Sequence, residues 1–118
     1  MKKKKILIVE DEYISAMGLE EELHDRNYET CEIAGSGKDA IRIAERERPD
    51  IVLMDIGLPG KINGIEAAKK INCRLKIPVI FISGYSEKEV KQLDLCGPIH
   101  FIRKPVDFDE LETVLAAL

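Results

Sequence analysis

The sequence predicts an α/β protein with an open, doubly wound parallel sheet of five strands. Three short apolar runs rich in β-branched residues occur at 6–9, 51–54 and 79–82. Runs of this length and composition are typical of strands buried on both faces, as in parallel sheets. The segments between the runs have helical periodicity, so strands alternate with helices. This alternation implies right-handed βαβ units with helices on both faces of the sheet.

The predicted strands follow one another along the chain. After the first strand at 6–9, the segment 28–33 alternates apolar and polar residues, as expected for an edge strand. The third and fourth strands, 51–54 and 79–82, are wholly apolar, and a weaker apolar run at 99–102 forms the fifth.

The predicted helices are marked by apolar stripes and by residues that favour helix starts. Stripes with the spacing i, i+3, i+7 are formed by Ala16, Leu19 and Leu23; by Ala68, Ile71 and Leu75; and by Phe108, Leu111 and Leu115. A capping residue precedes an acidic residue by three positions at Ser36 and Asp39, at Ser86 and Glu89, and at Asp107 and Glu110. The helix predicted over 86–95 has the weakest apolar side.

The composition indicates one folded domain over residues 1–118. Hydrophobic residues make up 45% and charged residues 34% of the chain, and its formal net charge is -4. We expect a cytoplasmic protein without a membrane span and without direct nucleic-acid binding. The lysine run at 2–5 is expected to be a solvated lead into the first strand. The last predicted helix is still amphipathic at Leu118, which favours a longer parent protein.

The cysteines do not indicate a disulfide framework or a zinc site. Cys31, Cys73 and Cys96 are an odd number of widely spaced residues without a C-x-x-C pair. We predict that all three are reduced thiols.

Polar residues follow the predicted strands where each one ends. Glu10 and Asp11 follow the first strand, Asp55 the third, Ser83 the fourth, and Lys104 the fifth. Ligands bind at the carboxyl ends of the strands in open α/β sheets, so we expect these side chains to converge. Any one acid is also explained as a helix cap. Three acids at one point repel each other unless a cation such as Mg²⁺ lies among them.

Five short motifs lie at these strand ends. They are Glu10-Asp11; Met54-Asp55-Ile56; Leu58-Pro59-Gly60 with Asn63-Gly64-Ile65-Glu66; Ile82-Ser83-Gly84; and Phe101-Ile102-Arg103-Lys104-Pro105. Together they resemble the response-regulator receiver domains of two-component signalling. The match covers essentially the whole chain. The resemblance implies a flavodoxin-like (βα)5 fold with strand order 2-1-3-4-5.

The resemblance also implies a phosphoacceptor with a metal ion beside it. Asp55 would become an acyl phosphate, and Mg²⁺ or Mn²⁺ would be bound by Asp11, Asp55 and the Gly57 backbone carbonyl. Glu10 would bind the metal through water. Pro105 would follow its lysine through a cis peptide bond.

Further roles follow from the same resemblance. Ser83 would donate a hydrogen bond to a phosphoryl oxygen, and Lys104 would pair with the phosphate charge. Phe101 would turn inward as the switch residue once Ser83 moves. Gly57 and Tyr85 would flank the path of the hydrolytic water, and we expect Tyr85 to shield the acyl phosphate.

The function implied is a phosphorylation-dependent signalling switch rather than an enzyme with a separate substrate. The phosphoryl donor would be a histidine kinase or a histidine phosphotransfer domain. A downstream target or fused output domain would read the face formed by the fourth helix, fifth strand and fifth helix. The domain would be a monomer or a phosphorylation-dependent dimer.

Three other readings of the sequence are less well supported. The segment 35–38 has the Gly and Lys of a phosphate loop but lacks the spacing and the Ser or Thr of a Walker motif. A flavodoxin-type cofactor site would place a phosphate against Glu10 and Asp11, which would repel it. A metal-dependent phosphatase would need a second acid at the position of Gly57.

Overall fold

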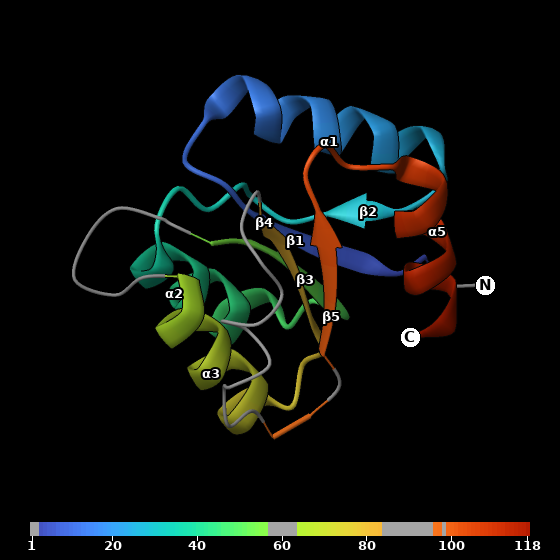
Figure 1. Cartoon of the computed structure of the whole chain (residues 1–118). Coiled ribbons are helices and arrows are strands. Elements are labelled where there is room, and N and C mark those ends of the chain that lie inside the picture. Colours follow the sequence, from blue (N-terminus) through green and yellow to red (C-terminus); the bar gives the residue numbers. More distant parts are fainter. Residues whose placement is uncertain (1–2, 57–63, 84–95, 98) are drawn as a thin grey trace.

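The computed structural model describes residues 3–56, 64–83, 96–97 and 99–118, and it contains one parallel sheet with helices on both faces (Figure 1). The strand order is β2-β1-β3-β4-β5, which confirms the predicted doubly wound fold. The strands are β1 (Lys5–Val9), β2 (Glu29–Thr30), β3 (Ile51–Asp55), β4 (Val79–Ser83) and β5 (Ile99–Arg103). The helices are α1 (Tyr13–Asp25), α2 (Gly37–Glu47), α3 (Gly64–Leu75) and α5 (Phe108–Ala117).

Two apolar cores lie on the two faces of the sheet. Successive side chains of a strand point to opposite faces, so Leu7 and Val9 pack under α2 and α3, whereas Ile6 and Ile8 pack under α1 and α5 (Figure 1). Both faces of β1 and β3 are therefore buried, as their continuous apolar runs predict. Among the described helices, none is long and apolar enough to cross a bilayer.

The second strand is shorter than predicted. The segment 28–33 was expected to be a strand throughout, but β2 has only two residues. The chain still follows β1 beyond β2: the Cys31 N–H donates to the Ile6 carbonyl at 3.0 Å, and the Ala34 N–H donates to the Ile8 carbonyl at 3.0 Å. An edge strand has one neighbour only, so its backbone leaves regular strand geometry more readily than a central strand does.

Two of the three predicted helix starts lie in the described part of the chain, and both are confirmed. The Ser36 hydroxyl accepts a hydrogen bond from the Asp39 N–H at 3.2 Å, and the Asp107 carboxylate accepts one from the Asp109 N–H at 2.9 Å. The helix predicted over 86–95 lies outside the described residues.

The lysine run is less solvated than predicted. Lys4 Nζ donates to the carbonyl oxygens of Leu115 at 2.8 Å and Leu118 at 3.0 Å, at the carboxyl end of α5. Lys5 Nζ forms an ion pair with Glu47 at 3.1 Å. A cation at a helix carboxyl end satisfies carbonyls that have no partner within the helix. The expectation of a purely solvated lead into β1 was therefore wrong for these two residues.

The prediction of three reduced cysteines was wrong for two of them. Cys73 and Cys96 form a disulfide although they are 23 residues apart in the sequence, and Cys31 is a buried free thiol. Cys73 lies near the end of α3, which leads into β4, and Cys96 lies on the segment that leads into β5. Because β4 and β5 are parallel neighbours, the segments before them meet at the same edge of the sheet.

Candidate functional site

The centre of the candidate site is Asp55, the last residue of β3. Its strand lies between β1 and β4, so the residues at the ends of three adjacent strands gather around it. Asp55 is only 8% exposed, and its Oδ1 lies 3.2 Å from Lys104 Nζ, which follows β5. The peptide bond from Lys104 to Pro105 is cis, as the resemblance implies.

Two further carboxylates complete an acidic cluster with Asp55. Glu10, Asp11 and Asp55 each offer an oxygen, and these oxygens lie within 4.8 Å of one another. Glu10 is buried and Asp11 is exposed. Glu10 also accepts a hydrogen bond from the Glu12 N–H at 3.2 Å, just before α1 begins. Glu10 thus bonds the N–H of the residue that precedes α1 and still lies against the other acids. The N-cap residue of α1, Glu12, makes no side-chain cap hydrogen bond, so the structure does not show the capping alternative for this helix.

The electrostatics of the cluster show a shortage of positive charge. Burial raises the pKa of Glu10 to about 7, and the hydrogen bond and charge of Asp55 act in the same direction. Partial burial lowers the pKa of Lys104, but the hydrogen bond to Asp55 and the nearby carboxylate charges outweigh it and raise this pKa overall. Among the residues that the structure describes, one ammonium group therefore faces the three carboxylates of the cluster. A divalent cation with a preference for oxygen ligands fits this donor set.

A close backbone contact joins α3 to the acceptor. Gly64 is the first residue of α3, and a Cβ at this position would lie 2.5 Å from the Asp55 carbonyl oxygen. Only glycine permits that approach, because real Cβ atoms do not come so near. The sequence analysis included Gly64 in a family motif but assigned it no packing role.

An open groove of about 720 Å³ runs from the acidic cluster along α1. Its polar end is formed by Glu10, Glu12 and Lys104, and its apolar wall includes Leu19 of α1 and Phe108 of α5. The sequence did not indicate this groove, because its walls come from segments about 90 positions apart in the chain.

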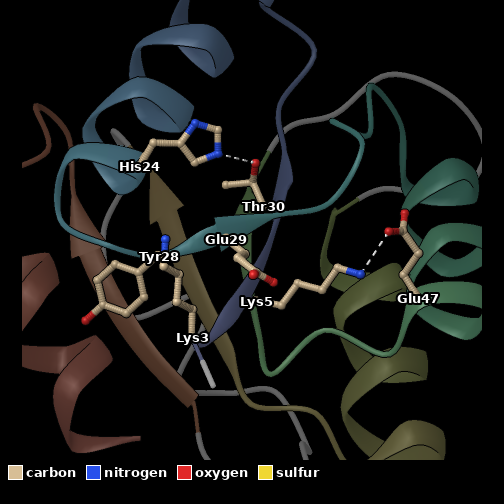
Figure 2. Close-up of a pocket in the computed structure, with 7 residues that line it drawn as sticks. All are labelled: Lys3, Lys5, His24, Tyr28, Glu29, Thr30 and Glu47. Atoms are coloured by element: carbon tan, nitrogen blue, oxygen red, sulfur yellow. Dashed lines mark hydrogen bonds and ion pairs between the residues drawn. The ribbon is translucent and has the colours of Figure 1, made fainter. Parts of the chain in front are cut away.

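A second pocket of about 430 Å³ lies at the opposite edge of the sheet (Figure 2). In it, Lys5 pairs with Glu47 at 3.1 Å, and His24 Nε2 lies 2.9 Å from Thr30 Oγ1. The lining residues are Lys3, Lys5, His24, Tyr28, Glu29, Thr30 and Glu47. Positive and negative side chains are mixed here, so the pocket lacks the uniform charge that would select an anion or a cation.

The remaining residues predicted for the site are described only in part. Ser83 ends β4, and its backbone pairs with Arg103 of β5. Phe101 is half-buried against the core under α2 and α3. Gly57, with the carbonyl predicted to bind metal, and Tyr85 lie outside the described residues.

The chain is similar to known proteins over nearly its whole length. The response regulator receiver domain family matches residues 6–116. The chain is 32% identical over 109 residues to transcriptional regulatory protein PdtaR of Mycobacterium tuberculosis, a match that covers 92% of this chain and 53% of that protein. It is 35% identical over 113 residues to sporulation initiation phosphotransferase F of Bacillus subtilis, covering 94% of this chain and 90% of that one. The chain thus spans about half the length of PdtaR.

Solved structures give the same result. The receiver domain of a Pseudomonas aeruginosa sensor histidine kinase, solved with magnesium coordinated in its active site cleft, superposes with a TM-score of 0.83 at 26% identity. That match covers 98% of this chain and 97% of the other. Sequence, fold and the match over residues 6–116 agree, and we conclude that the chain belongs to the response regulator receiver domain family of two-component signalling.

Proposed function

We propose that this receiver domain accepts a phosphoryl group on Asp55 and thereby changes the surface that it presents to other proteins. The observation that carries the proposal is the position of the Asp55 carboxylate, which is buried, lies in contact with Lys104 and belongs to the acidic cluster. Phosphoryl transfer requires chiefly in-line positioning and the neutralisation of charge, and these groups provide both.

A divalent cation, Mg²⁺ or Mn²⁺, would be held by Asp11 and Asp55, by the Gly57 carbonyl, and by Glu10 through water. When bound, it would supply positive charge against the oxygens of the transferring phosphoryl group. The three carboxylates within 4.8 Å of one another support this assignment. The magnesium reported in the similar Pseudomonas aeruginosa receiver domain supports it as well.

The residues of the chain then carry out the transfer. An oxygen of Asp55 attacks the phosphorus of a phosphohistidine, the P–N bond breaks, and the imidazole leaves with the bonding electron pair. Lys104 moves its hydrogen bond from Asp55 to a phosphoryl oxygen, and the Ser83 hydroxyl donates to another. Phe101 fills the space that the shifted Ser83 leaves. The only substrate changed is the domain itself, together with its phosphodonor.

The phosphodonor would be a histidine kinase or a histidine phosphotransfer domain that docks on α1. Three large apolar side chains at the start of this helix face solvent: Tyr13 is 69% exposed, Ile14 80% and Met17 47%. They lie on the same helix as Ser15, Gly18 and Leu19, which line the groove next to Glu10 and Lys104. A partner that covers these apolar side chains would bind on α1, close to the site around Asp55. We propose that this occurs in the cytoplasm, where ATP charges the kinase.

The phosphorylated state would act on a downstream target or a fused output domain. We propose that this partner reads a face that includes β5 and α5, because Phe101 lies in β5 and Ser83 ends the neighbouring strand β4. The domain would be a monomer, or a dimer that forms on phosphorylation.

The lifetime of the acyl phosphate would depend on Gly57 and Tyr85. Gly57 has no side chain to orient a hydrolytic water, and Tyr85 would shield the phosphoryl group by its bulk. Tyr85→Ala should shorten the lifetime about threefold, which corresponds to about 0.7 kcal/mol in the barrier. The decay of labelled protein in excess Mg²⁺ after removal of the donor measures this. An equal or longer lifetime in the variant would exclude shielding.

The decisive experiment is phosphorylation by acetyl phosphate, followed by intact mass spectrometry. The wild-type chain should gain one phosphoryl group in the presence of Mg²⁺ and none in excess EDTA. Asp55→Asn should gain none, because the amide is not a comparable nucleophile. Asp25→Asn, at the far end of α1, is the matched control and should be labelled like the wild type. Labelling of the Asp55 variant would refute the proposal.

A further inference from the structure

The disulfide between Cys73 and Cys96 lies at the opposite edge of the sheet from Asp55. The sulfur atoms of Cys73 and Cys96 are bonded, and the Cα atoms of the two residues are 5.0 Å apart. Cys73 lies in the last turns of α3, and Cys96 lies on the segment that leads into β5. The bond therefore joins the two elements whose other ends carry Gly64 and Lys104 beside the candidate phosphorylation site.

The two cysteines are held together by contacts that do not involve sulfur. Asn72, beside Cys73 in α3, is fully buried. Its Oδ1 accepts hydrogen bonds from the N–H groups of Cys96 at 2.9 Å and Gly97 at 2.7 Å, and its Nδ2 donates to the Ile77 carbonyl at 3.1 Å. These bonds hold the backbone of Cys96 next to Cys73, and none of them uses a sulfur atom, so reduction of the disulfide would not itself remove them. The thiols are thus preorganised to react with each other.

The close approach of the two segments also depends on Gly97. A Cβ at this position would lie 3.1 Å from Asn72 Nδ2. That spacing is tighter than most real Cβ contacts, so a residue without a side chain suits the position. Asn72 and Gly97 together hold Cys96 in its position, and neither residue belongs to the candidate phosphorylation site.

Accessibility separates this pair from the third cysteine. Cys96 is exposed and Cys73 is partly exposed, so a small disulfide molecule can reach them. Cys31 is 4% exposed, and burial raises the pKa of its thiol to about 11. Thiol–disulfide exchange needs an accessible thiolate, so Cys31 is a poor reactant and serves as an internal control.

We propose that Cys73 and Cys96 form a reversible redox site, oxidised by low-molecular-weight disulfides such as oxidised glutathione. The Cys96 thiolate attacks one sulfur of the glutathione disulfide, breaks its S–S bond and releases one glutathione thiolate. The Cys73 thiolate then attacks the Cys96 sulfur, forms the intramolecular bond and releases the second glutathione. The cysteines lose two electrons, the glutathione disulfide gains them, and its two thiolates take up the two protons.

Oxidation at this site should change the stability of the domain. The bond closes a loop over a sequence separation of 23 residues that contains the whole of β4. Such a loop restricts the unfolded chain, so the oxidised protein should melt about 10 °C higher than the reduced protein. In a compartment that keeps thiols reduced, Cys73 and Cys96 would remain free thiols until the surroundings become oxidising.

The test uses the full chain, reduced with dithiothreitol, freed of it, and equilibrated with mixtures of reduced and oxidised glutathione. Free thiols are then alkylated and counted by mass spectrometry. The wild type should lose two alkylation sites together and yield a peptide cross-linked through Cys73 and Cys96, while Cys31 stays alkylated. Cys31→Ala should behave in the same way. Cys73→Ser should stop at a mixed disulfide between Cys96 and glutathione.

Two further measurements separate the proposed site from an incidental pairing of thiols. Reduction should lower the Tm of the wild type and of Cys31→Ala by about 10 °C and leave that of Cys73→Ser and Cys96→Ser unchanged. In Asn72→Ala, the equilibrium constant for forming the disulfide should be about tenfold lower, because the backbone of Cys96 is no longer held next to Cys73. A cooperative melting transition shows that this variant is folded. Accumulation of the glutathione adduct in the wild type, disulfide-linked dimers instead of the internal bond, or equal Tm values in both redox states would overturn the proposal.

Discussion

Glu10 is a buried carboxylate that touches a second acid, and its protonation should govern how the cluster responds to pH. Burial and the neighbouring Asp55 raise its pKa to about 7, well above the ordinary value of 4.5. The folded protein without metal therefore holds a proton here that the unfolded chain releases at lower pH. At neutral pH the site is divided between protonated and ionised forms, and binding of a cation would favour the ionised form.

The first prediction concerns stability against pH in the absence of metal. Because the pKa of Glu10 is raised in the folded state, protonation of Glu10 stabilises the folded protein. This stabilisation is fully present below pH 4.5 and is lost as the pH rises to about 7. The loss should be about 3 kcal/mol, and Glu10→Gln should remove it. Urea unfolding in EDTA between pH 4.5 and 8 measures how the free energy of unfolding of each protein changes with pH. The same change with pH in the wild type and in Glu10→Gln would contradict the assignment of this effect to Glu10.

The second prediction concerns Lys104, whose Nζ lies 3.2 Å from Asp55 Oδ1. Lys104→Ala should leave Mg²⁺ affinity largely intact, because an ammonium group is not a metal ligand. The same variant should lose most of the chemical-shift response to beryllofluoride, since its charge is needed once the phosphoryl analogue is present. Lys69→Ala, on the exposed side of α3, is the control. A full set of shifts in the Lys104 variant would remove this residue from its proposed role.

At the scale of elements, the carboxyl ends of β1 and β3 carry the acidic cluster, the end of β5 leads to Lys104, and α3 contacts the backbone of Asp55. The start of α3 rests on the backbone of Asp55 through Gly64. Its other end is joined to the segment before β5 by Asn72 and by the disulfide. One helix thus contacts the acceptor at one edge of the sheet and the cysteine pair at the other.

The third prediction concerns that helix. Gly64→Ala would place a Cβ 2.5 Å from the Asp55 carbonyl oxygen, so α3 or β3 must shift. We expect a destabilisation of about 1–3 kcal/mol. The rate of labelling by acetyl phosphate should fall about tenfold or more, because a small displacement of the acceptor disturbs in-line attack. Gly35→Ala, where a Cβ meets nothing within 4 Å, is the control. Equal labelling rates in both variants would show that the contact does not position Asp55.

For the whole molecule, the acidic cluster is a source of repulsion that the proposed cation would relieve. Its carboxylates are held at the ends of strands whose apolar sides are buried in two cores, so they cannot move apart without loss of packing. Binding of the proposed metal ion would therefore be linked to global stability.

The fourth prediction follows from this linkage. Mg²⁺ at ten times its Kd should raise the free energy of unfolding by about 1.4 kcal/mol. Asp55→Asn should raise the stability of the metal-free protein by about 1 kcal/mol, because it removes a like charge, and it should abolish most of the Mg²⁺ effect. Thermal melts with EDTA and with Mg²⁺ measure both quantities. The same Mg²⁺ response in both proteins would contradict the proposed ligand set.

The sequence by itself determined the sheet, the strand ends and the residues that gather there. Short apolar runs and helical stripes depend only on local spacing, and the carboxyl ends of parallel strands must share one edge, so the cluster of Glu10, Asp11 and Asp55 was predictable. Only the tertiary structure decided the contacts that α3 makes with other segments. Its approach to the lead into β5 brings Cys73 to Cys96 and Asn72 to the backbone of Cys96 and Gly97. Its approach to β3 packs Gly64 on the backbone of Asp55. Both approaches are results of packing, and no local pattern in the sequence encodes them.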